Sequence, residues 1–136
     1  MSRKPAITIS RLDMERIEAL LERMPPAQVQ AHAWLREELD RAKVVEPAAM
    51  PRDVVTMNST VSFVDEAGGT PLTLTLVYPN AAGKPGTVSI LAPVGSALLG
   101  LAKGKQIGWP TPDGHTRRLT VLSVDYQPES AGELHR

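Results

Sequence analysis

The periodicity of the apolar residues changes once along the chain, and this change limits the possible folds most. The first part repeats apolar residues at spacings of three and four, as one face of a helix does, at Met14, Ile17, Leu21 and Met24. Residues 72–77 instead alternate leucine with threonine or valine, as a half-buried strand does. Between the two lies the segment 46–51 with two prolines, which favours an extended path. The pattern predicts a helical unit at residues 1–46, a linker at 47–52 and a sheet-containing domain at 53–136.

The N-terminal unit is predicted to be a short antiparallel helical hairpin. Ser10 followed by Asp13 resembles a capping box and marks the start of the first helix. Pro25 and Pro26 end it, and a second helix is expected over residues 27–44. A short link between two amphipathic helices gives an antiparallel pair, here a short coiled coil that looks detached from the rest of the chain.

The C-terminal unit is predicted to be an antiparallel sheet of about five strands with one short helix, so the fold class is α+β. Strand patterns lie near residues 54–64, 72–77, 87–91, 106–109 and 117–126. Pro93 ends the third strand, Ser96 is expected to cap the short helix, and Gly100 suits its left-handed end. Ile90, Leu98 and Leu99 are expected in the core, and residues from 128 onward form a polar tail expected to be mobile.

Composition favours a protein partner over nucleic acid or membrane. Positive and negative side chains number 15 each, so the net charge is zero and DNA binding by the chain alone is disfavoured. No apolar run approaches the roughly 20 residues of a membrane helix, and no signal peptide is visible. Cysteine is absent from the sequence, which fits the cytoplasm.

No catalytic constellation, metal site or cofactor is predicted. His32, His115 and His135 show no metal-ligand spacing. The glycine–lysine segment 100–105 departs from a phosphate loop, and Ser96 has Val94 and Leu98 at the two outer positions where a nucleophile elbow has glycines. Glu37 and Glu38 are interpreted as part of a solvated helix face.

Three segments resemble the C-terminal domain of the Gre transcript-cleavage factors. They are Met-Asn-Ser-Thr-Val at residues 57–61, the strand, proline turn and glycine-ended helix of 87–105, and Thr-Pro-Asp-Gly at 111–114. Residues 50–59, 76–79, 92–95 and 126–129 resemble more closely a short Gre-like branch, the regulators of nucleoside diphosphate kinase. The resemblance to the Gre C-terminal domain extends over about residues 51–126.

The resemblance implies an FKBP-like C-terminal domain that docks on the rim of the RNA polymerase secondary channel, with the coiled coil pointing into it. The implied polymerase-binding residues are Leu91, Ala92, Pro93, Val94 and Ser96. Residues 91 and 92 replace a polar residue and a serine of the cleavage factors, which implies a more apolar contact. In those factors, acidic residues at the coiled-coil tip help to hold a catalytic magnesium ion.

The predicted tip here lacks a carboxylate, since it consists of Pro25, Pro26, Ala27 and Gln28. A neutral tip offers no charged oxygen ligand to a hard metal ion. We therefore predict a non-enzymatic transcription regulator that binds RNA polymerase near the secondary channel and competes with Gre-type factors.

Two alternatives follow from the same sequence. An FKBP-like prolyl isomerase would need several aromatic residues around its pocket, and aromatic residues make up only 4% of the chain. A protein-binding adaptor could act through the hairpin stripe of Met14, Ile17 and Leu21, although such stripes usually pack against a neighbouring element of their own chain.

Overall fold

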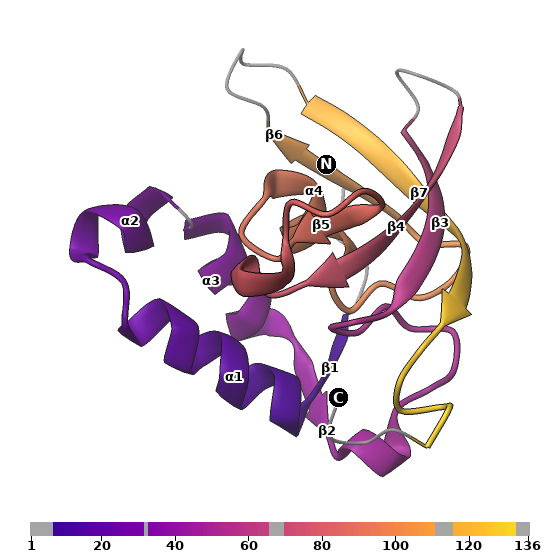
Figure 1. The fold of residues 1–136 in the computed structure, drawn as a ribbon, viewed down its shortest axis with the longest axis horizontal. Helices are drawn as coiled ribbons and strands as arrows, with labels where there is room; N and C mark the ends of the chain where they lie inside the picture. Colours follow the sequence, from indigo (N-terminus) through magenta and orange to yellow (C-terminus); the bar gives the residue numbers. More distant parts are fainter. Residues whose placement is uncertain (1–6, 32, 66–69, 111–115, 133–136) are drawn as a thin grey trace.

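The C-terminal part of the chain contains a five-stranded sheet (Figure 1). The computed structural model describes residues 7–31, 33–65, 70–110 and 116–132. In the order β5-β4-β3-β7-β6, the strands are β5 (Thr87–Ser89), β4 (Pro71–Val77), β3 (Thr60–Asp65), β7 (Thr116–Tyr126) and β6 (Gln106–Pro110). The β3–β4, β3–β7 and β6–β7 pairs are antiparallel, as the sequence predicts.

The sheet is mixed, so the prediction of an antiparallel sheet is wrong for one pair. Strand β5 runs parallel to β4, with Thr75 opposite Thr87 and Val77 opposite Ser89. The segment between them contains the 3-10 helix η2 (Pro79–Ala81). This segment returns the chain to the starting side of β4, so β5 follows the same direction.

The first helix matches the prediction and the second is shorter than predicted. Helix α1 (Arg11–Glu22) begins after Ser10, whose Oγ accepts the Asp13 N–H at 3.1 Å. The second predicted helix corresponds to α2 (Pro26–Ala31) and α3 (Ala33–Arg41). It ends at Arg41 because β2 (Lys43–Val45) pairs in parallel with β1 (Thr8–Ser10). We call residues 11–41 the arm.

The arm packs against the part of the chain from residue 53 onward, which we call the sheet unit. The expectation of a detached hairpin is therefore wrong. Figure 1 shows its helices gathered on one side of the molecule. One core cluster contains arm residues Ile17, Leu21 and Leu35 together with Val61 and Leu98 of the sheet unit. Burial of Ile17 and Leu21 removes the surface that the adaptor alternative requires.

Helix α4 (Pro93–Leu98) and the residues after it complete the core. Ile90, Leu98 and Leu99 are fully buried, as predicted. Gly100 follows with φ +80°, the left-handed conformation expected at a helix end. Its carbonyl accepts the Thr8 N–H at 3.1 Å, which joins the start of the chain to the end of α4.

The C-terminal segment up to residue 132 is held by hydrogen bonds, which corrects the expectation of a mobile tail from residue 128. Gln127 is buried, and its Nε2 donates to the carbonyls of Pro51 and Val54 at 2.7 and 2.8 Å. Thr56 Oγ1 donates to Glu129 Oε1 at 2.8 Å. The segment is therefore fixed to residues 51–56, which follow the 3-10 helix η1 (Pro47–Ala49).

Several predicted features fall outside the described residues. These are most of the loop after Asp65, the turn at 111–114, and His32, His115 and His135. In the part of the chain that the structure describes, no helix has the length and apolar character needed to cross a bilayer.

Substitution of Gly100 by alanine is expected to destabilise the fold strongly. A Cβ at this position would lie 2.7 Å from Ile7 Cβ and 3.1 Å from the Thr8 carbonyl oxygen. Gly104 has a similar φ of +84° but open space around it, so Gly104→Ala tests the backbone strain alone. We expect the free energy of unfolding in urea to fall by about 1 kcal/mol for Gly104→Ala and about 3 kcal/mol for Gly100→Ala. Equal losses would show that the close approach to β1 does not matter.

Candidate partner-binding surface

Residues 91–94, which we call the docking turn because they are predicted to bind a partner, are fixed to the end of β5 by hydrogen bonds. Ser89 accepts twice, at its Oγ from the Leu91 N–H (3.1 Å) and at its carbonyl from the Ala92 N–H (3.0 Å). The preceding residue, Ile90, donates its N–H to the Val77 carbonyl at 2.9 Å. The turn therefore has a defined shape set by the sheet.

Helix α4 starts earlier than predicted, and Ser96 has a different role. Ala92 is the N-cap and Pro93 opens the helix, a position where the missing N–H of proline is harmless. Ser96 lies inside the helix, is only 4% exposed and donates its Oγ to the Ile90 carbonyl at 2.7 Å. The predicted capping role of Ser96 is wrong, because the helix begins three residues before it.

Gly95 permits α4 to lie directly against the end of β5. A Cβ built on Gly95 would come 2.0 Å from the Ser89 carbonyl oxygen. Real side chains do not approach so closely, so another residue here would push α4 away from β5. The sequence alone did not predict this role for Gly95.

Three residues of the docking turn present apolar side chains at the surface. Leu91, Ala92 and Val94 are all partly exposed, and Leu91 and Val94 also contact the core. The backbone of Pro93 forms the start of α4. Ser96 supports the turn from the interior, so it is not part of this surface.

The predicted tip lies at the far end of α1. Pro25 precedes α2, and the other three tip residues, at positions 26–28, form its first turn. The Gln28 N–H donates to the Pro25 carbonyl at 2.9 Å. All four residues are exposed.

Asp13 joins the arm to the sheet unit. Its Oδ2 accepts the Met57 N–H at 3.1 Å, and the side chain is only 2% exposed. Burial raises the pKa of the Asp13 carboxyl to about 7, and the nearby Glu129 carboxylate acts in the same direction. The hydrogen bonds with Met57 and Ser10 and the positive charge of Arg16 lower this pKa and only partly offset the effect of burial. The sequence identified Asp13 only as a capping residue, since its partner lies 44 positions away.

Glu38 is also buried, contrary to the predicted solvated face. It is 1% exposed, and its Oε2 accepts from Arg41 Nε at 2.7 Å. Arg41 thus neutralises the carboxylate where the chain turns from α3 toward β2.

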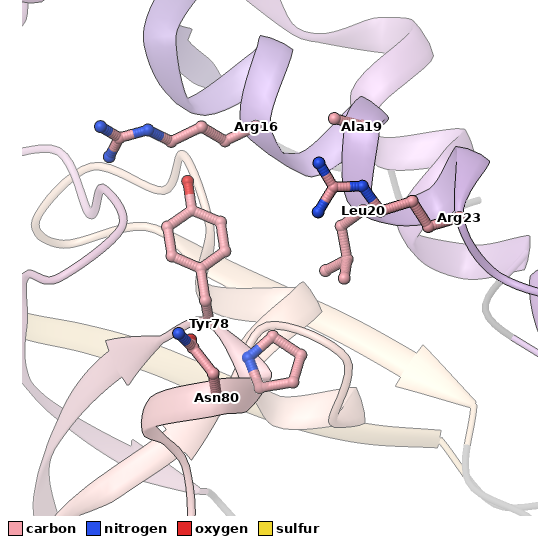
Figure 2. A pocket seen from close by; sticks show the side chains of 7 residues that line it. Arg16, Ala19, Leu20, Arg23, Tyr78 and Asn80 are labelled. Carbon is pink, nitrogen blue, oxygen red and sulfur yellow. The ribbon is translucent and has the colours of Figure 1, made fainter.

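A pocket of about 550 Å³ lies between α1 and the segment after β4 (Figure 2). It is lined by Arg16, Ala19, Leu20, Arg23, Tyr78, Pro79 and Asn80. The sequence alone did not predict this pocket or a role for Arg16 and Arg23. Their spacing of seven, which puts them on one helix face, was the available signal.

Metal-binding groups do not gather in the described parts of the chain. Within residues 7–31, 33–65, 70–110 and 116–132, no three histidine, aspartate or glutamate side chains lie close enough to hold an ion.

Comparison with known proteins identifies the family. Residues 50–126 match the C-terminal family of the transcription elongation factors GreA and GreB, and residues 5–45 match the Rnk N-terminus. The chain therefore belongs to the GreA/GreB family, in its Rnk-like branch.

Three relatives show the extent of the similarity. The chain is 48% identical over 131 residues to the regulator of nucleoside diphosphate kinase of Escherichia coli K12, covering 96% of each protein. It is 34% identical over 93 residues to GreA of Azorhizobium caulinodans, covering 68% of this chain and 59% of that one. A solved GreA/GreB elongation factor of Nitrosomonas europaea is 49% identical, with a TM-score of 0.69 over 90% of this chain and all of that one.

Replacement of Asp13 by asparagine is expected to change how stability depends on pH. A carboxyl whose pKa rises from 3.8 to about 7 on folding binds more protons in the folded state, so it favours folding at low pH and penalises it as pH rises toward 7. Asparagine keeps an oxygen for the Met57 N–H without the buried charge. Between pH 5 and 8, the unfolding free energy of Asp13→Asn should gain about 1–3 kcal/mol relative to the parent.

Urea unfolding at several pH values measures this difference. Asp53→Asn, at an exposed aspartate, serves as the control and should show no such change. If the difference in unfolding free energy between the parent and Asp13→Asn stays constant with pH, the raised pKa of Asp13 is contradicted.

Proposed function

We propose that this protein is a non-enzymatic transcription regulator that binds RNA polymerase near its secondary channel and competes there with Gre-type factors. The observation that carries the proposal is the docking turn, where Leu91, Ala92 and Val94 form a partly exposed apolar surface in the segment that belongs to the GreA/GreB C-terminal family. The regulator and elongation-factor names of the relatives fit this role.

The docking turn suits a protein interface on physical grounds. Its backbone is already ordered by the Ser89 hydrogen bonds, so binding costs little conformational entropy. Burial of Leu91, Ala92 and Val94 by a partner would add apolar contact at about 25 cal/mol per Å². A largely apolar contact should also depend only weakly on salt.

The two units are proposed to have different roles in binding the polymerase. Residues 53–136 form an FKBP-like dock, residues 47–52 link it to the rest, and the hairpin of residues 1–46 points toward the channel. The exposed tip of Pro25, Pro26, Ala27 and Gln28 would approach the polymerase without adding a metal ligand. The protein would thus occupy the site of a cleavage factor and leave transcript cleavage unstimulated.

A charge in the docking turn should abolish polymerase binding. We expect Leu91→Asp to lower the affinity measured in a pull-down or by biolayer interferometry at least about tenfold, because a buried, unpaired carboxylate is costly at an interface. Leu122→Asp is the matched control, since Leu122 of β7 is 41% exposed and lies outside the turn. No binding by the parent, or equal binding by Leu91→Asp and the parent, would refute this dock.

Backtracked elongation complexes test the non-enzymatic part. We expect the protein to leave the rate of transcript cleavage at its intrinsic value, and to reduce the stimulation caused by an added Gre factor as its own concentration rises. Stimulated cleavage by this protein alone would overturn the claim, and undiminished Gre stimulation at saturating protein would overturn the competition.

A further inference from the structure

The pocket between α1 and residues 78–80 has the chemistry of a binding site for an organic anion. Two of its seven lining residues, Arg16 and Arg23, carry guanidinium groups and none carries a carboxylate. A volume of about 550 Å³ lies within the range of small-molecule sites, roughly 300–1,000 Å³. The pocket therefore has both the charge and the size for a phosphorylated small molecule.

The two positively charged side chains line the α1 side of the pocket and lie at separate places along it. Figure 2 shows Arg16 above the hydroxyl of Tyr78 and Arg23 toward the other end of the pocket. Two turns of helix separate the two residues, about 10 Å along the axis. A single small inorganic ion would not use both guanidinium groups, whereas an elongated ligand could.

The two ends of the pocket differ electrostatically. The buried Asp13 carboxyl lies near Arg16. Burial is the main cause of the raised pKa of the Tyr78 hydroxyl, and the Asp13 and Glu129 carboxylates raise it further. Arg23 has no ion pair with a carboxylate among the described residues of the chain. Arg23 is therefore the better place for the anionic group, and guanidinium binds phosphate through paired hydrogen bonds.

The space between the arginines favours a flat or apolar group. The Leu20 side chain points into the pocket from α1, opposite the ring of Tyr78 and the segment of Pro79 and Asn80 (Figure 2). An aromatic ring and a leucine accept a planar group well, because stacking on an aromatic face suits any base. Asn80 adds a hydrogen-bonding amide.

We propose that this pocket binds a nucleoside phosphate, with its phosphates at Arg23 and its base between Leu20 and Tyr78. The site joins the arm to the segment between β4 and β5, so a bound ligand would contact both units. This inference does not depend on polymerase binding, because it concerns the isolated protein.

Titration of the full-length protein tests the proposal. GDP and ADP are the probes, with guanosine and inorganic pyrophosphate as partial ligands, followed by calorimetry and by amide chemical shifts. We expect a nucleotide to bind at least about tenfold more tightly than either partial ligand, with shifts at Ala19, Leu20 and Asn80. Equal binding of pyrophosphate, equal binding of guanosine, shifts elsewhere, or no binding at millimolar nucleotide would each overturn it.

Variants assign the contacts. Arg23→Gln should weaken nucleotide binding about tenfold or more, as expected for loss of a charge-assisted phosphate contact, and Asn80→Ala should weaken it less. Both side chains are exposed, so both variants should fold normally. Arg52→Gln removes an exposed positive charge outside the pocket and should bind like the parent. Equal weakening by Arg23→Gln and Arg52→Gln would reduce the effect to net charge and refute the site.

Discussion

The close approach of Gly95 to the carbonyl of Ser89 is the constraint on which the docking turn depends. It lets α4 begin immediately after β5, because a Cβ at residue 95 would lie 2.0 Å from that oxygen. The Ser96 hydroxyl then reaches the Ile90 carbonyl, and the Ser89 side chain reaches the Leu91 N–H. The turn is thus closed from both ends, which leaves its apolar side chains at the surface in one arrangement.

Contacts with the same core hold the arm in position. Asp13 binds the Met57 N–H, and the Gly100 carbonyl binds the Thr8 N–H, so polar contacts fix the start of α1 to the sheet unit. Ile17 and Leu21 add apolar packing. A protein that needs its tip in a fixed direction relative to its docking turn gains from such a joint. A metal-binding tip would need carboxylates, and the tip of this arm has none.

Local patterns predicted the features that neighbouring residues determine. The start of α1 at Ser10, the alternating strands, the left-handed Gly100 and the buried Ile90, Leu98 and Leu99 all follow from short sequence windows. The parallel β5, the burial of Glu38 and the pocket depend on partners distant in sequence or in a different element, so periodicity could not reveal them. Family membership was recognisable because the matching segments recur in order. Of the predicted contact residues, Ser96 proved interior, since the position of α4 relative to β5 is a matter of packing.

Site-specific photo-crosslinking to RNA polymerase tests the central claim most directly. A crosslinking amino acid at Ala92 would probe the docking turn, and one at the exposed Leu122 would provide the control on the sheet. We predict a crosslink from residue 92 to the rim of the secondary channel that an excess of Gre factor removes, and none from residue 122. The absence of a crosslink from residue 92, or one that excess Gre factor leaves unchanged, would contradict it.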